Sequence, residues 1–170
     1  MATDRTPPLI IGVDPGGQWV GVVARQGRTL IAHKLVTRRD TDMQTWITAV
    51  LDAITHVRTK AVVHDITTGG SPGRIAVEGL NPPNPHMGIT SVRGLLDTAQ
   101  VLGAVVATYR QDVLVIPPDG HGSGPITAYP APLYPKTGKG RGHDQNRHCR
   151  SAWDIAAAAA VQLRLQEASR

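Results

Sequence analysis

Three short runs rich in Val and Ile follow one another near the N-terminus, and they constrain the fold more than any other feature. They cover residues 8–14, 19–25 and 29–36, with turn residues such as Gly27 between them. Such runs are typical of strands, and strands joined by tight turns pair antiparallel. The sequence therefore predicts a three-stranded antiparallel meander at the start of a sheet.

After the meander, the chain alternates between helical and strand patterns. From residue 42, apolar side chains recur at helical spacing, with Asp40 or Thr41 as the expected N-cap. This helix ends near residue 59 or continues to about 66, and the pattern fits either end. The remaining predicted elements are a strand at 74–78, a helix at 89–108, a strand at 112–116 and a closing helix from 151.

Composition limits the class of protein. Because 41% of the 170 residues are hydrophobic, we predict one domain over residues 1–170 with a substantial core. No apolar run is long enough to span a membrane and the first residues lack a signal-peptide pattern, so we expect a cytoplasmic protein. Cys149 is the only cysteine, which excludes a disulfide framework and a zinc site built from cysteines. The formal charge of +5 favours a polyanionic partner, nucleic acid or an acidic membrane surface.

Two predicted strands end on a carboxylate, and a third carboxylate lies in the closing helix. Asp14 follows the first apolar run, Glu78 follows the run "RIAV", and Asp154 lies within "SAWDIAAAAA". Each acid also has a structural explanation: a turn residue, an ion pair with an arginine, and a capping box with Ser151 as N-cap. The sequence alone leaves these alternatives open.

These motifs carry a family resemblance. "GVDPG" at 12–16, "AVEG" at 76–79 and "SAWDIAAAAA" at 151–160 resemble the motifs of RuvC-type Holliday junction resolvases, in the ribonuclease H-like superfamily. The resemblance implies an α/β, ribonuclease H-like fold: a mixed five-stranded sheet, three antiparallel strands then two parallel, flanked by helices. The short chain and "RHCRSAWDIA" are most similar to the resolvases of phages that infect actinobacteria, which implies a bacterial cytoplasm.

A metal site is the chemical use that the resemblance implies for the three acids. Three carboxylates at one place repel each other and raise each other's pKa values, and divalent cations relieve that repulsion. Oxygen ligands favour Mg²⁺, with Mn²⁺ as a substitute, and two such ions can activate water and stabilise the leaving oxygen of a phosphodiester. We therefore expect Asp14, Glu78 and Asp154 to be catalytic metal ligands.

A fourth ligand is expected from the stretch before Asp154. The family places an Asp or His three residues before the helix acid, where this chain has Ser151. His148 lies six residues before Asp154 and reaches the second ion if Ser151 is the N-cap and His148 precedes the helix. We expect His148 as the fourth ligand, with Asp144 as the alternative.

A basic stretch precedes the closing helix and predicts contact with DNA. Glycines between the cations allow a close approach to phosphates, although a solvated charged loop is the alternative. The expected DNA-binding residues are Lys136, Lys139, Arg141, Arg147 and Arg150.

Together these features predict a metal-dependent, structure-selective endonuclease that resolves Holliday junctions and related branched DNA by phosphodiester hydrolysis. We expect a homodimer, because a four-way junction has two-fold symmetry and the family pairs through the helix at 89–108. The alternatives are a ribonuclease H-like nuclease for RNA/DNA hybrids or other substrates, and a branched-DNA binding protein that does not cleave. Sugar kinases and actin-like ATPases also contain a ribonuclease H-like core, but they need a longer, two-lobed chain, so the length of this chain argues against both classes.

Overall fold

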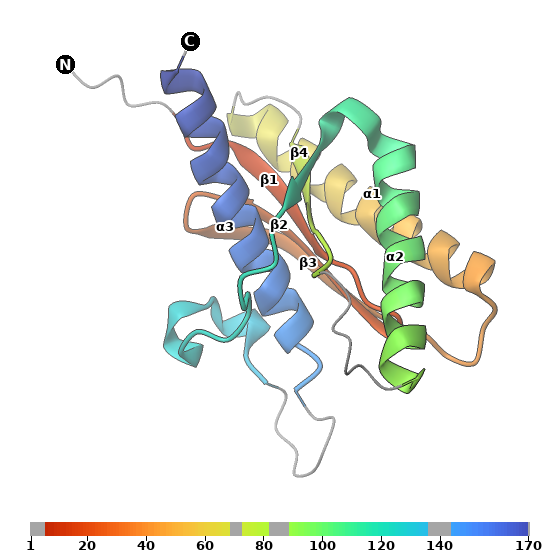
Figure 1. The fold of residues 1–170 in the computed structure, drawn as a ribbon. Coiled ribbons are helices and arrows are strands. Elements are labelled where there is room, and N and C mark those ends of the chain that lie inside the picture. Colours follow the sequence, from red (N-terminus) through yellow and green to blue (C-terminus); the bar gives the residue numbers. More distant parts are fainter. Residues whose placement is uncertain (1–5, 69–72, 82–88, 136–143, 170) are drawn as a thin grey trace.

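A mixed five-stranded sheet lies at the centre of the structure, a computed structural model that describes residues 6–68, 73–81, 89–135 and 144–169 (Figure 1). The strand order is β3-β2-β1-β4-β5. The strands are β1 (Leu9–Asp14), β2 (Trp19–Gln26), β3 (Thr29–Thr37), β4 (Arg74–Glu78) and β5 (Val113–Ile116). The helices are α1 (Met43–Thr68), α2 (Ile89–Tyr109) and α3 (Arg147–Ala168), with short 3₁₀ helices η1 (Arg110–Asp112), η2 (Ile126–Ala128) and η3 (Ala131–Leu133).

Strand pairing confirms the predicted fold class. β1 pairs antiparallel with β2, and β2 with β3, as expected of a meander. β1 pairs parallel with β4, and β4 with β5. Parallel neighbours cannot be joined by a tight turn, so α1 and α2 connect them. The result is the predicted α/β arrangement of three antiparallel strands followed by two parallel ones.

Alternating side chains of β1 face two different layers of helix. Leu9, Ile11 and Val13 pack with α1 and α2 in one core, whereas Ile10 packs with Ile155 of α3 in another. Figure 1 accordingly shows α3 lying across one face of the sheet, with α1 behind the other face. Among the described helices, none has the length and apolarity that a membrane span requires.

The helix α3 lies unusually close to the sheet because glycines face it. A Cβ atom on Gly12 of β1 would lie 1.9 Å from the carbonyl oxygen of Ala152, and one on Gly21 of β2 would lie 2.1 Å from that of His148. Real Cβ atoms do not approach backbone oxygens this closely, so only glycine fits at these two positions. Together with the buried Ala152 and Ala156, the glycines place the helix backbone directly on the strands.

A third cluster covers the start of α3 from the side of the β2–β3 hairpin. It contains Leu133 of η3 together with Cys149 and Trp153 of α3. The thiol of Cys149 is fully buried, 3.8 Å from the carbonyl oxygen of Lys34. The guanidinium of Arg25 lies 4.0 Å above the ring of Trp153, which closes the cluster on its outer side.

Helix α1 continues to Thr68, so the longer of the two predicted ends is the observed one. Its N-terminus is capped by Asp42, whose Oδ1 accepts a hydrogen bond from the backbone N–H of Thr45 at 2.9 Å. The predicted cap at residue 40 or 41 is therefore wrong.

Helix α3 begins at Arg147, about one turn before the predicted N-cap. Ser151 is consequently buried inside the helix, and the backbone N–H of Arg150 already donates to the carbonyl oxygen of Asn146 at 3.0 Å. The alternative explanation of Asp154, a capping box with Ser151 as N-cap, is therefore excluded. His148, expected before the helix, lies in its first turn.

We predict that Gly12→Ala destabilises the protein, because the added Cβ would overlap the Ala152 carbonyl and displace α3. Overpacking of this kind costs about 1–3 kcal/mol. Gly103→Ala in α2 is the matched control, since its Cβ would meet no described neighbour within 4 Å and alanine favours a helix by roughly 0.5–1 kcal/mol. Urea unfolding measures both free energies. A Gly12→Ala protein as stable as wild type would disprove the tight contact.

Candidate active site

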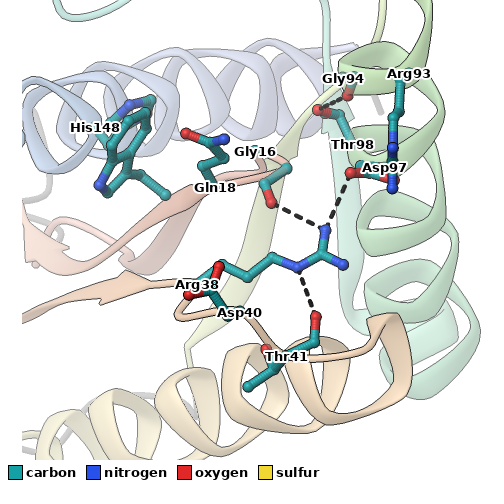
Figure 2. Close-up of a pocket in the computed structure, with 12 residues that line it drawn as sticks. Gly16, Gln18, Arg38, Asp40, Thr41, Arg93, Gly94, Asp97, Thr98 and His148 are labelled. Carbon is teal, nitrogen blue, oxygen red and sulfur yellow. Dashed lines mark hydrogen bonds and ion pairs between the residues drawn. The ribbon is translucent and has the colours of Figure 1, made fainter. Parts of the chain in front are cut away.

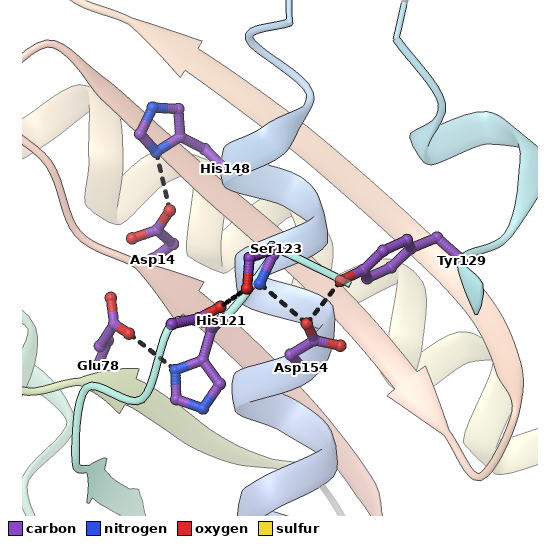
Figure 3. Close-up of polar contacts among 9 residues, drawn as sticks. Asp14, Glu78, His121, Ser123, Tyr129, His148 and Asp154 are labelled. Atoms are coloured by element: carbon purple, nitrogen blue, oxygen red, sulfur yellow. Dashed lines mark hydrogen bonds and ion pairs between the residues drawn. The ribbon is translucent and has the colours of Figure 1, made fainter. Parts of the chain in front are cut away.

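Two carboxylates lie side by side at the ends of neighbouring strands. β1 and β4 are parallel and in register, with Gly12 opposite Ala76 and Val13 opposite Val77. Because side chains alternate, Asp14 points to the same face as Gly12, and Glu78 to the same face as Ala76. Both acids therefore lie on the face covered by α3 (Figure 3). The predicted convergence of these two strand ends follows directly from the register.

The environment of Glu78 opposes negative charge. The side chain of Asp14 is only 12% exposed and that of Glu78 only 19%. Burial raises the pKa of Glu78, the hydrogen bond to His121 acts in the opposite direction, and the nearby charge of Asp14 raises the pKa further. The neighbouring Asp14 carboxylate therefore makes ionisation of Glu78 less favourable.

A histidine accompanies each carboxylate. Nδ1 of His148 lies 2.8 Å from Oδ2 of Asp14, and Nδ1 of His121 lies 2.7 Å from Oε1 of Glu78. The ring of Trp19 stacks on His148 at a centroid distance of 6.0 Å and an interplanar angle of 21°. His148, which sequence analysis selected, thus contacts Asp14, and β2 supplies the ring that holds it in place.

The structure does not bring Asp154 to the other two acids. Oδ2 of Asp154 accepts hydrogen bonds from the backbone N–H of Gly122 at 2.9 Å and from the hydroxyl of Tyr129 at 2.8 Å. Figure 3 shows its carboxylate turned toward Tyr129 and away from Asp14 and Glu78. The expected cluster of three carboxylates therefore needs correction.

The reason lies in the phase of α3. Six residues separate His148 from Asp154 on one continuous helix, a rotation of about 600° that leaves the side chains roughly 120° apart. Since Ala152 and Ala156 face the sheet, Asp154 points outward while His148 reaches Asp14. In the part of the chain that the structure describes, no three His, Cys, Asp or Glu side chains form a group that could hold a metal ion.

Tyr129 is buried against the outer face of α3. Its hydroxyl donates to Asp154 and accepts from the backbone N–H of Gly124 at 3.0 Å. Burial raises the pKa of Tyr129, and the hydrogen bond to Asp154 and the charge of that carboxylate raise it further. The tyrosine therefore remains a hydrogen-bond donor at neutral pH.

The predicted DNA-binding residues fall into three groups. Arg147 is exposed at the start of α3. Arg150 is only 5% exposed: its guanidinium donates to the carbonyl oxygen of Leu133 at 3.1 Å and forms an ion pair with Asp144. These partners make Arg150 a structural residue, which corrects its expected contact with phosphates, and they also hold Asp144, the alternative ligand. The predicted residues that lie outside the described ranges are Lys136, Lys139 and Arg141.

A cleft of about 810 Å³ opens beside His148, between the β1–β2 turn, the end of β3 and the start of α2 (Figure 2). Arg38 connects its walls, donating to Oδ2 of Asp97 at 3.0 Å and to the carbonyl oxygen of Thr41 at 3.1 Å. Arg93 of α2 also lines the cleft and is exposed. The cleft thus extends from the candidate site to an exposed guanidinium group.

Sequence analysis missed His121 and Tyr129. Both belong to the Pro- and Gly-rich stretch between β5 and α3, where no periodicity indicates which side chains point inward. The one signal in the sequence is the length of this stretch, because irregular chain of such length is uncommon in a compact domain unless it has a function.

The fold is similar to that of RuvC from Thermus thermophilus. A structure of T. thermophilus RuvC in complex with a Holliday junction substrate matches with a TM-score of 0.57 and 17% identity, covering 94% of this chain and 96% of that one. A second Thermus thermophilus RuvC structure matches with a TM-score of 0.52 and 17% identity, covering 93% and 96%. No protein-family model and no curated protein match the sequence. The chain therefore has a RuvC-like fold.

We predict that Glu78→Gln stabilises the metal-free protein at neutral pH. The raised pKa of Glu78 means that the folded state favours the protonated acid, so ionisation costs folding free energy as pH rises above the unfolded pKa. Gln carries no charge and still accepts a hydrogen bond from His121. The gain should vanish below about pH 4, where glutamate is protonated even when unfolded.

Urea unfolding in the presence of a chelator, at both pH values, measures this difference. Asp52→Asn, at an exposed carboxylate of α1, is the control and should change stability little. If Glu78→Gln were less stable than wild type at neutral pH, the Glu78 charge would be stabilising.

Proposed function

We propose that the protein is a metal-dependent endonuclease that cleaves Holliday junctions and related branched DNA. One observation carries the proposal: two carboxylates, the buried Asp14 and the half-buried Glu78, meet at adjacent strand ends on a RuvC-like fold. Buried like charges are retained when a cation neutralises them in the working state. The RuvC neighbour bound to a Holliday junction supports branched DNA as the substrate class.

The donor chemistry of the pair fits a hard divalent cation. Carboxylate oxygens are the preferred ligands of Mg²⁺ and Mn²⁺, and removal of their repulsion would favour binding. Asp14 and Glu78 would hold the metal, with His148 orienting Asp14 or acting as a further ligand. When bound, two such ions supply an activated water and stabilise the leaving oxygen of the phosphodiester.

The chain's own residues define how the substrate approaches. The cleft beside His148 has room for a strand of nucleic acid, and Arg93 in its lining would neutralise a phosphate. Arg147, exposed one residue before His148, would contact the backbone near the scissile bond. These cations belong to α2 and α3, and each lines a hollow to which His148 also contributes.

We also propose a homodimer that pairs through α2. Val92 and Leu96 of this helix are 41% and 57% exposed, and large apolar side chains at such exposure are typical of a contact surface. A two-fold dimer presents two active sites to a two-fold junction, so that symmetric strands are nicked together.

The decisive experiment compares cleavage of a labelled four-way junction, a linear duplex, a fork and an RNA/DNA hybrid, with and without Mg²⁺. We predict that Asp14→Asn and Glu78→Gln each reduce junction cleavage at least about 100-fold, because each removes metal-binding charge, while junction binding remains. Asp52→Asn on α1 is the control and should cleave normally.

Other outcomes favour the alternatives. Preferential cleavage of the hybrid would indicate a ribonuclease H-like activity. Tight junction binding without cleavage, with either Mg²⁺ or Mn²⁺, would indicate a binding protein. Normal cleavage by Asp14→Asn would remove that residue from the site.

We predict that Arg147→Ala flattens the salt dependence of junction binding by about one unit of log K against log salt, as expected for one lost phosphate contact. Arg58→Ala on α1 removes the same charge from the opposite layer and should leave the slope unchanged. Joint replacement of Lys136, Lys139 and Arg141 by alanine tests the remaining cations, with an expected change of up to about 2 to 3 units. Binding across a salt series provides the measurement. Unchanged slopes for every variant would locate the DNA-binding surface elsewhere.

A further inference from the structure

The segment between β5 and η2 connects the carboxylate pair to the outer face of α3. Two consecutive residues in it contact acids on different elements: His121 contacts Glu78 of β4, and Gly122 contacts Asp154 of α3. Figure 3 shows the segment passing between these two acids. A fixed position of this segment would therefore fix His121 relative to Glu78.

The backbone of the segment is held in a conformation that requires glycine. Gly120 and Gly122 have φ angles of +61° and +79°, which residues other than glycine rarely adopt. A Cβ on Gly122 would lie 2.8 Å from the backbone nitrogen of Ser151, so the segment packs directly on α3. The backbone N–H of Ser123 donates to the carbonyl oxygen of Gly120 at 3.3 Å, which closes a tight turn around His121.

Asp154 is the polar centre of this contact. Its Oδ2 receives the Gly122 N–H and the Tyr129 hydroxyl, and that hydroxyl receives the Gly124 N–H. Gly122 and Gly124 of the segment, together with Tyr129 after η2, are thus connected to one carboxylate oxygen. Tyr129 is only 6% exposed, so these bonds are partly shielded from water and hold the segment more firmly than fully exposed ones would.

We propose that Asp154 is an anchor rather than a metal ligand, and that it places His121 as a further residue of the candidate site, where His121 positions Glu78. This inference rests on the proposed metal-dependent function. His121 is only 10% exposed and lies 2.7 Å from Oε1 of Glu78, which leaves the other carboxylate oxygen for a cation. Hydrogen bonds of this kind orient ligating carboxylates, and their loss typically lowers metal affinity by about 10- to 100-fold.

The test compares Asp154→Asn with Asp154→Ala. The side-chain carbonyl of asparagine still accepts two hydrogen bonds, so Asp154→Asn keeps the anchor, whereas Asp154→Ala removes it. Similarly, His121→Asn keeps a donor near the Nδ1 position and His121→Ala does not. Two measurements are made on each full-length variant: Mn²⁺ affinity by calorimetry, and backbone hydrogen exchange over residues 119–124 without metal.

We expect Asp154→Asn to bind Mn²⁺ within about threefold of wild type, with unchanged exchange. We expect Asp154→Ala to exchange faster over residues 119–124 and to bind Mn²⁺ about 10-fold more weakly or worse. His121→Ala should lose affinity by about 10- to 100-fold with less effect on exchange at Gly122, and His121→Asn should recover part of the loss.

Several results would overturn the inference. If Asp154→Asn lost Mn²⁺ binding as Glu78→Gln does, while exchange was unchanged, Asp154 would be a ligand. If His121→Ala bound Mn²⁺ as well as or better than wild type, His121 would not position Glu78 for metal. If Asp154→Ala failed to fold, Asp154→Asn and the two His121 variants would still decide.

Failure of the proposed function gives a different result. Wild-type protein that binds no Mn²⁺, or Asp14→Asn and Glu78→Gln proteins that bind it normally, would exclude a metal site at the carboxylate pair. Wild-type binding that is lost in these two variants and kept in His121→Ala would overturn only the role of His121.

Discussion

The close contact of α3 with β1 and β2 is the constraint on which the site depends. Gly12 and Gly21 leave no space between helix and sheet, so the helix cannot move along the strands without a backbone collision. That contact fixes the first turn of α3 above the end of β1 and brings His148 to Asp14. It also fixes which side chains of α3 point outward, and therefore where the segment from β5 packs. The contact of α3 with the sheet thus determines the position of His148 beside Asp14 and the position of the segment from β5.

The carboxylate pair places an electrostatic cost at one end of the sheet, and that cost falls on Glu78. Strand register brings Asp14 and Glu78 together, and burial and the Asp14 charge both raise the pKa of Glu78, so its ionisation raises the free energy of the folded protein. Natural proteins retain such unfavourable features mainly at working sites, where a ligand compensates for them. The surrounding core is apolar and regular, so the unfavourable electrostatics are confined to this end of the sheet.

The sequence predicts the direction of a side chain only where a periodic pattern of apolar and polar residues defines it. The ends of β1 and β4 were predictable because strand alternation and the parallel register fix the face of Asp14 and Glu78. The phase of α3 was not, since the alanines from 156 to 160 are alike on every side and do not indicate which face meets the sheet. Arg150 was misjudged because a charged side chain was assumed to be exposed. Its partners, the Leu133 carbonyl and the Asp144 carboxylate, lie in the stretch between β5 and α3, whose position the sequence does not indicate. His121 lies in irregular chain, where only tertiary contacts set the direction of a side chain.

The buried thiol of Cys149 provides a view of motion in this molecule. It is the chain's one sulfhydryl group, and it lies in the first turn of α3, next to His148 and within the third core cluster. A thiol reagent can reach it only when that turn separates from the β2–β3 hairpin, so its rate of alkylation reports how often the helix opens at the candidate site. The native protein therefore reports its own local opening where His148 meets the sheet, and no cysteine has to be added by mutation.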